Sequence, residues 1–124
     1  MLESTFQNKV LKKALKDNFP DAFIQKNDPV DNQGFPDLTI LLGTRYAVLE
    51  VKKSEAEYIL EQGSREAQMK DARRHNQRYY IDKINNVGFA AFIYPENMDE
   101  IIEQLHRFFG GSGNNCYYEY PTKD

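Results

Sequence analysis

The stretch GFPDLTILLGTRYAVLEVKK, residues 34–53, decides the fold. It holds two apolar runs, at 38–42 and 46–53, on either side of Gly43, Thr44 and Arg45. Apolar runs that flank a short glycine-containing connection are typical of a β-hairpin. We therefore predict two adjacent antiparallel strands, the second apolar enough to be covered on both faces.

Charged residues interrupt this hairpin. The predicted turn places Asp37, at the start of the first strand, opposite Glu50, near the end of the second. Two ionised carboxylates side by side repel each other, and a hard cation such as Mg²⁺ or Mn²⁺ removes the repulsion. Side chains alternate along a strand, so Lys52 shares a face with Glu50 and reaches an anion held at the cation. This set suits phosphodiester hydrolysis, although Glu-x-Lys pairs are also common on solvated strand edges.

The spacing of apolar residues predicts the elements around the hairpin. They are a helix that begins near residues 3–5 and ends at Pro20, a strand at 22–27, a helix from Asn76 to Gly88, a strand at 89–94 and a helix at 98–109. Ser4 and Gln7 have capping-box spacing at the first helix, and 54–74 is expected to be helical only in part. The α-β-β-β-α-β-α order allows a parallel crossover beside the hairpin. We therefore predict one α/β domain, with a mixed central sheet and helices on both faces.

The composition fits one globular domain of 124 residues, with 40% hydrophobic and 28% charged residues. No apolar run reaches the roughly 18 residues of a membrane span and no apolar signal segment opens the chain, so no membrane partner and a cytoplasmic location are expected. Cys116 is the only cysteine, which excludes an intrachain disulfide and a thiolate zinc cluster. The net charge of -3 argues mildly against a nucleic-acid coat protein, but residues 65–83 are locally basic.

The motifs resemble those of a known nuclease superfamily. GFPDLTIL followed by YAVLEVKK resembles the PD-(D/E)XK signature, through Pro36, Asp37, Glu50, Val51 and Lys52. With LESTFQ at 2–7 and NQRYYIDKINNVGFAAFIYPEN at 76–97, the layout is similar to the virus-type replication-repair nuclease (VRR-NUC) branch, and most of all to small stand-alone bacteriophage nucleases. The resemblance implies a restriction-endonuclease-like VRR-NUC domain over 1–109. It leaves 110–124 as a tail that is flexible or forms an edge strand.

The resemblance also implies a role for each matching residue. Asp37 and Glu50 match the metal-binding carboxylates, and the main-chain carbonyl of Val51 would be a further ligand for Mg²⁺, with Mn²⁺ as a substitute. Lys52 matches the catalytic lysine. Glu3 matches the acidic residue of the first helix, a position that the helix dipole favours in any case. Gln77 matches the glutamine of the later helix, with Gln68 as the alternative. No small-molecule cofactor is implied.

Basic residues after the third strand are candidates for DNA contacts. They are Lys53, Arg65, Arg73, Arg74 and Arg78, which could hold the DNA backbone without reading sequence. A solvated helix face explains the same charges.

The expected function is that of a Mg²⁺-dependent DNA endonuclease. The resemblance implies branched substrates such as Holliday junctions, and a homodimer for which Tyr79 and Tyr80 are candidate anchors. One alternative is a nuclease that acts on linear or foreign duplex DNA. Another is a non-catalytic nucleic-acid-binding module, against which the presence of Asp37, Glu50 and Lys52 argues. If the chain is encoded by a phage, the expected location is the host cytoplasm.

Overall fold

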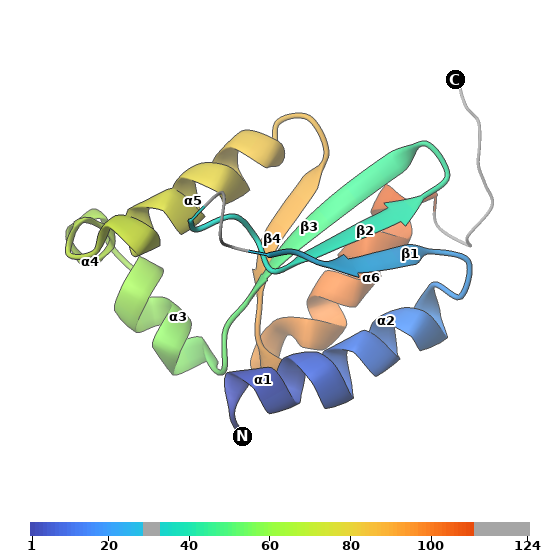
Figure 1. Ribbon diagram of the computed structural model, residues 1–124, viewed down its shortest axis with the longest axis horizontal. Helices are drawn as coiled ribbons and strands as arrows, with labels where there is room; N and C mark the ends of the chain where they lie inside the picture. The colour runs from blue at the N-terminus through green and yellow to red at the C-terminus, as the bar shows by residue number, and fades with distance from the viewer. Residues whose placement is uncertain (29–32, 111–124) are drawn as a thin grey trace.

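A four-stranded mixed sheet forms the centre of the fold in the computed structural model, which describes residues 1–28 and 33–110 (Figure 1). The strands are β1 (Phe23–Lys26), β2 (Leu38–Leu42), β3 (Arg45–Val51) and β4 (Phe89–Ile93), in the order β1-β2-β3-β4. The pairs β1·β2 and β2·β3 are antiparallel, and β3·β4 is parallel. The predicted α/β class and mixed sheet are therefore confirmed.

The hairpin between β2 and β3 has the predicted register. Leu38 pairs with Leu49 and Thr39 with Val48, so the next positions outward along the same register are Asp37 and Glu50. Gly43 takes a φ of 63° in the turn, a conformation that costs glycine little. β3 ends at Val51 rather than at Lys53, although the main-chain N–H of Lys52 still donates to the carbonyl of Ile93 at 2.8 Å.

The crossover from β3 to β4 contains three helices where one main helix was expected. They are α3 (Glu55–Gln62), α4 (Arg65–Met69) and α5 (Ala72–Ile84). The predicted start at Asn76 is wrong, because the side chain of Asp71 caps α5 by accepting from the N–H of Arg73 at 2.8 Å. The helix also ends at Ile84, before the predicted stop at Gly88, and Val87 beyond it is exposed.

The amino-terminal helix is continuous but irregular. It runs through α1 (Glu3–Thr5), the π-helical η1 (Phe6–Leu11) and α2 (Lys12–Asn18). The N–H of Lys12 bonds the carbonyl of Gln7, five residues back, as a π-helical turn requires. The predicted capping box at Ser4 is wrong, because Ser4 lies inside the helix and Leu2 holds the cap position without a side-chain bond.

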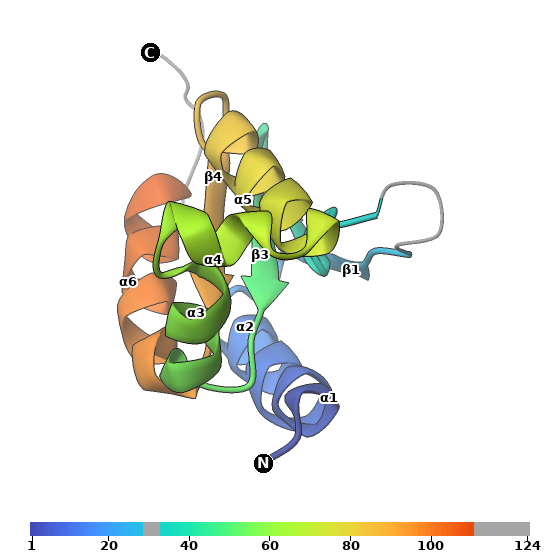
Figure 2. The same cartoon turned by 90° about the vertical axis from the view of Figure 1, so that its left-hand side faces the viewer.

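Helices cover both faces of the sheet. Figure 1 shows α5 above the sheet, and α1, α2 and α6 (Met98–Phe108) below it; Figure 2 gives the view along the sheet. A short 3₁₀ turn, η2 (Pro95–Asn97), leads into α6. The larger apolar cluster lies below the sheet and includes Phe6, Leu11, Leu15, Leu38, Ile40, Leu49, Ile93, Ile102 and Leu105. The smaller lies above it and includes Val48, Ile81, Ala90 and Phe92.

The alternation of β3 follows from these two clusters. Leu49 and Val51 belong to the lower cluster and Val48 to the upper one, so Glu50 lies on the α5 side of the sheet. None of the helices in the described ranges is long and apolar enough to cross a membrane. The predicted tail beyond Gly110 lies outside the described residues.

Candidate active site

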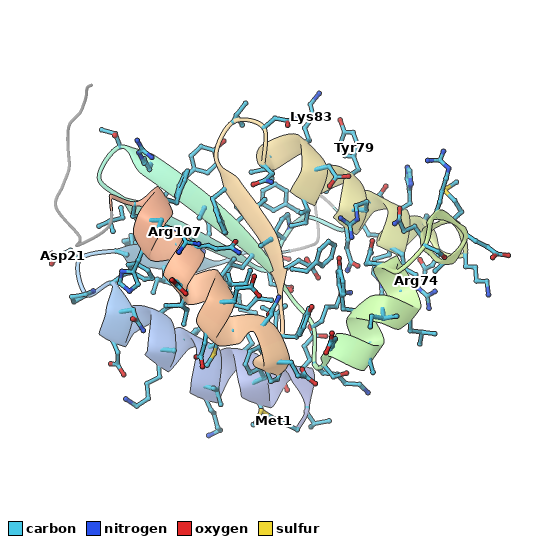
Figure 3. All side chains as sticks on the ribbon, turned by 180° about the vertical axis from the view of Figure 1, so that it is seen from behind. Met1, Asp21, Arg74, Tyr79, Lys83 and Arg107 are labelled. Atoms are coloured by element: carbon cyan, nitrogen blue, oxygen red, sulfur yellow. The ribbon has the colours of Figure 1, made fainter. Side chains whose placement is uncertain are left out.

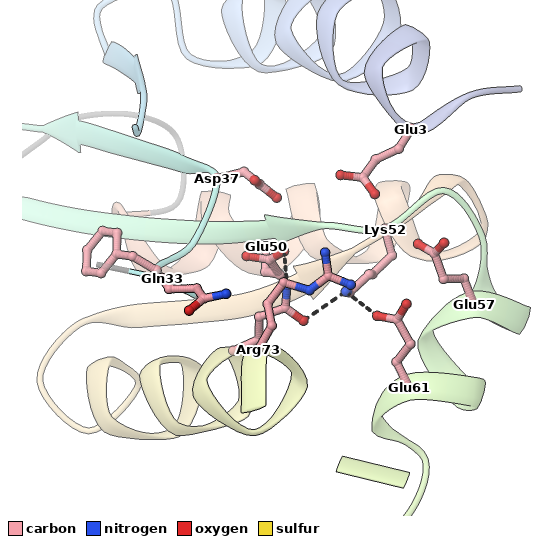
Figure 4. A pocket seen from close by; sticks show the side chains of 11 residues that line it. Glu3, Gln33, Asp37, Glu50, Lys52, Glu57, Glu61 and Arg73 are labelled. Carbon is pink, nitrogen blue, oxygen red and sulfur yellow. Dashed lines mark hydrogen bonds and ion pairs between the residues drawn. The ribbon is translucent and has the colours of Figure 1, made fainter. Parts of the chain in front are cut away.

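A pocket of about 660 Å³ lies where the amino-terminal helix, the hairpin, α3 and α5 meet (Figure 4). Five carboxyl side chains line it: Glu3, Asp37, Glu50, Glu57 and Glu61. The cations Lys52 and Arg73 and the amides Gln33 and Gln77 also line it, with Gly34 and Phe35. The structure therefore brings together all five predicted catalytic side chains, which lie up to 74 positions apart along the chain (Glu3 to Gln77).

Asp37 and Glu50 are neighbours at the bottom of this pocket. Asp37 accepts a hydrogen bond from the main-chain N–H of Val51 at 2.8 Å, so the side chain is fixed against β3. Burial raises the pKa of Asp37, and the Val51 N–H opposes this shift. Burial, and then the charge of Asp37, raise the pKa of Glu50 to about 10. Glu50 is accordingly protonated at neutral pH, and its carboxyl group donates a hydrogen bond to Asp37.

Gln77 joins the acid pair to the lysine. Its side-chain carbonyl accepts from Nζ of Lys52 at 2.9 Å, and its amide N–H donates to Oε2 of Glu50 at 3.1 Å. All three side chains are buried, so the bridge holds them in one arrangement. The alternative candidate, Gln68, lies on α4 and donates to the main-chain carbonyl of Gln62 instead. Gln77 is therefore the glutamine that reaches the acid pair.

Glu61 is the residue that the sequence interpretation missed. Its Oε1 lies 2.6 Å from Nζ of Lys52, and only 13% of its side chain and 4% of the lysine's are exposed. Glu57 lines the same pocket one helical turn earlier on α3. A local signal for α3 was present, since Ser54 caps the helix by accepting from the N–H of Glu57. The contact with Lys52 depends on how α3 packs, which no local pattern specifies.

Glu3 reaches the pocket from the first turn of α1. It is half-buried, and burial, followed by the charge of Asp37, raises the pKa of its carboxyl group. Glu3 lies at a helix start, where the helix dipole favours an acid, and it also lies beside the acid pair, so both explanations offered for this residue apply.

The basic candidates divide between different places. Arg73 lines the pocket from the first turn of α5, and Lys53 is exposed. Arg65 and Arg78 line a second hollow. Arg74 donates to the carbonyl of Ala67 at 3.4 Å and so packs between α4 and α5. Contact with DNA stays a prediction for all five, and Arg73 is the one placed beside the acid pair.

The donor set fits a divalent oxygen-seeking cation. Asp37 and Glu50 supply carboxylate oxygens. Burial raises the pKa of both groups, so without a cation they share a proton, which a bound cation would displace. In residues 1–28 and 33–110, no group of three or more His, Cys, Asp or Glu side chains is arranged to hold a metal. The predicted set differs from such a group, since it takes two carboxylates and the main-chain carbonyl of Val51.

A scan against protein-family models, a search of the curated proteins and a search of the solved structures found no match to this chain.

Proposed function

We propose that this protein is a metal-dependent endonuclease that hydrolyses phosphodiester bonds of DNA. One observation supports this above the others: Gln77 bridges Glu50 and Lys52 in the pocket that also holds Asp37 and Glu3. A sheet edge with a surface Glu-x-Lys pair would leave these side chains exposed, whereas here Glu50 and Lys52 are buried. A buried carboxyl group with a raised pKa in a pocket, as Glu50 is, is typical of catalytic sites.

Each residue has a role in this proposal. Asp37, Glu50 and the carbonyl of Val51 would hold Mg²⁺, or Mn²⁺ in its place, and the cation would supply Lewis-acid stabilisation and a more acidic water. Lys52 places its ammonium group where it can stabilise negative charge on the phosphate oxygens. Gln77 keeps that ammonium group in position relative to Glu50. Water adds to phosphorus, one P–O ester bond breaks, and the leaving oxygen takes up a proton.

The charge of the pocket supports the need for a cation. Five carboxyl groups and two cationic side chains line it, so a phosphodiester anion meets an acidic surface unless positive charge is added. The structure offers Arg73 as the one arginine at this pocket. A divalent cation would remove the proton shared by Asp37 and Glu50 and make the pocket accept the anion.

Branched DNA, such as a four-way junction, is the proposed substrate, and a homodimer the proposed assembly. Both come from the resemblance to small phage nucleases, as does a location in the host cytoplasm. Tyr79, one of the two candidate dimer anchors, is exposed on α5, whereas the ring of Tyr80 packs against Phe35 at 5.2 Å. Tyr80 therefore packs behind Phe35, which lines the pocket, and Tyr79 is the better candidate for a contact between copies.

The test is cleavage of a labelled four-way junction and of its matched linear duplex, with Mg²⁺, Mn²⁺ or EDTA. The wild type is compared with Asp37→Ala, and with Asp17→Ala as a control, because Asp17 is an exposed carboxylate on α2 paired only with Lys13. We expect metal-dependent cutting of the junction by the wild type and by Asp17→Ala, and none by Asp37→Ala.

The other outcomes separate the alternatives. Cutting of both substrates at equal rates would keep the nuclease and remove the preference for branches. Binding without cutting in either metal would favour a non-catalytic nucleic-acid module. Equal cutting by Asp37→Ala would contradict the assignment of this pocket as the active site.

A further inference from the structure

A second hollow, of about 340 Å³, lies beside α4 and α5 and shares no lining residue with the candidate active site. Four residues with basic side chains line it, Arg65, His75, Arg78 and Lys83, together with one acid, Asp82. The chain as a whole has a net charge of -3, whereas the residues that line this hollow are mostly positively charged.

Helix α5 separates the two places because it presents a different face to each. Arg73 and Gln77 follow one another at a four-residue spacing and line the active-site pocket. His75, Tyr79 and Lys83 have the same spacing but start two positions later, and they line the second hollow. In Figure 3, Tyr79 and Lys83 both project outward from α5.

Contacts of the half-buried Arg78 make the floor of the hollow rigid. The guanidinium group of Arg78 donates to the hydroxyl of Tyr58 at 3.0 Å and lies 4.9 Å from the ring centre of Phe92. Its Nε also donates to Oε1 of Gln62 at 3.4 Å, and Asp82 lies 3.6 Å away. A cation held in this way keeps its place without further ordering when an anion arrives.

The rim of the hollow carries cations that are not neutralised. In the part of the chain that the structure describes, the side chains of Arg65 and Lys83 have no hydrogen-bond or ion-pair partner, whereas Asp82 faces Arg78. Tyr79 adds a ring that is 52% exposed. Unpaired cations contact the phosphates of a DNA backbone, and a tyrosine hydroxyl can donate a hydrogen bond to the same backbone.

We propose that this second hollow binds the phosphate backbone of duplex DNA, on the side of α5 opposite to the strand that is cut. The choice of DNA as the polyanion rests on the proposed nuclease function. The two binding places lie on different faces of one helix, about 10 Å thick, so one substrate can contact both. The enzyme would then hold the duplex at Arg65, Arg78 and Lys83 while a strand enters the acidic pocket.

The test is binding of a labelled duplex in EDTA at several salt concentrations, which involves no cleavage. The double variant Arg65→Ala/Lys83→Ala is compared with Lys9→Ala/Lys16→Ala, which removes the same charge from exposed positions on the amino-terminal helix. We expect the hollow variant to bind roughly tenfold more weakly near 0.1 M salt. The slope of log K for DNA binding against the log of the salt concentration should also be smaller by about 2, because each of the two lost phosphate contacts contributes roughly 0.9 to that slope.

Three results would overturn the inference. The first is an unchanged slope in the hollow variant, and the second is an equal loss in both double variants, which would show an effect of net charge alone. The third is equally tight binding of polyglutamate, which would replace DNA by acidic polypeptide. The two proposals fail separately, because a reduced slope without cleavage in any metal keeps the hollow, and cleavage with an unchanged slope keeps the nuclease.

Discussion

Lys52 and Glu61 form a buried ion pair, with Nζ and Oε1 2.6 Å apart and with 4% and 13% of the two side chains exposed. The lysine reaches this position from the end of β3, and the glutamate from the last turn of α3. The pair therefore fixes α3 to the sheet at the point where the candidate lysine must be held. The ammonium group is shared with Gln77, so its place is defined from two helices.

We expect Glu61→Gln to lower the free energy of unfolding by about 3 kcal/mol, because it leaves the Lys52 charge buried without its counter-ion. Urea unfolding measures this change. The matched control is Glu103→Gln, which breaks a pair with Arg107 whose two side chains are mostly exposed and should cost under about 1 kcal/mol. Equal costs in the two variants would contradict the importance of the buried pair.

Stability should fall as pH rises, because the folded state binds the Glu50 proton more tightly than the unfolded state does. The pKa of this group rises from its ordinary value of 4.5 to about 10, so the stabilisation is complete below pH 4.5 and is lost toward pH 10. The slope for one such group is about 1.4 kcal/mol per pH unit. Unfolding in EDTA between about pH 6 and 8 tests this. Glu50→Gln should flatten the curve, and Glu103→Gln should leave it unchanged.

Mg²⁺ should raise the melting temperature of the wild type, since a ligand that binds only the folded state stabilises it. The effect should grow with pH, because the cation competes with the proton shared by Asp37 and Glu50. Asp37→Asn should abolish it. A Mg²⁺-dependent rise that persists in Asp37→Asn would place the cation elsewhere on the protein.

Gln77→Ala should reduce kcat for phosphodiester cleavage by about 10²-fold, because Lys52 and Glu50 lose the amide that holds them together. Gln104→Ala is the matched control, as this amide bonds Glu100 on the surface of α6 and lines neither pocket. Steady-state kinetics on the cleaved substrate distinguish the two. If both variants lose the same activity, Gln77 acts through the fold rather than at the site.

Gly34→Ala should destabilise the protein by about 2 kcal/mol and also lower activity. Gly34 has a φ of 89°, and an added Cβ would lie 2.6 Å from Cβ of Asn76, so the segment before Asp37 would have to move away from α5. Gly43→Ala is the control, since its φ of 63° is similar but no atom lies within 4 Å. It should cost about 1 kcal/mol and leave activity intact.

The hairpin and the acid pair could be predicted from sequence because their signals are local. A glycine in the turn fixes the register, and strand alternation then fixes the faces on which Leu49 and Glu50 lie. The packing of α5 on β3 is decided by tertiary structure, so no local signal pointed to Gln77; the resemblance to the VRR-NUC branch did.

The part that could not be predicted is the region between β3 and α5. The helices α3 and α4 are largely polar, and α4 has no fully buried residue, so apolar periodicity does not mark them. Ser54 and Ser64 cap these helices, and such caps can be recognised in a sequence, but no periodic apolar pattern follows either serine to mark a helix. The partnership of Glu61 with Lys52 depends on the angle at which α3 returns, which tertiary packing decides.

The π-helical turn at η1 sets the rotational phase of the amino-terminal helix. Phe6 and Leu11 are both buried although they lie five positions apart, whereas Leu11 and Leu15 lie the usual four positions apart. The extra residue turns everything before it by about 100° relative to a regular α-helix. Glu3 faces the pocket because of this residue, so deleting the exposed Asn8 would turn Glu3 away from the pocket and the buried Phe6 away from the core. The number of residues in the π-helical turn, more than their type, thus sets the direction of the Glu3 side chain.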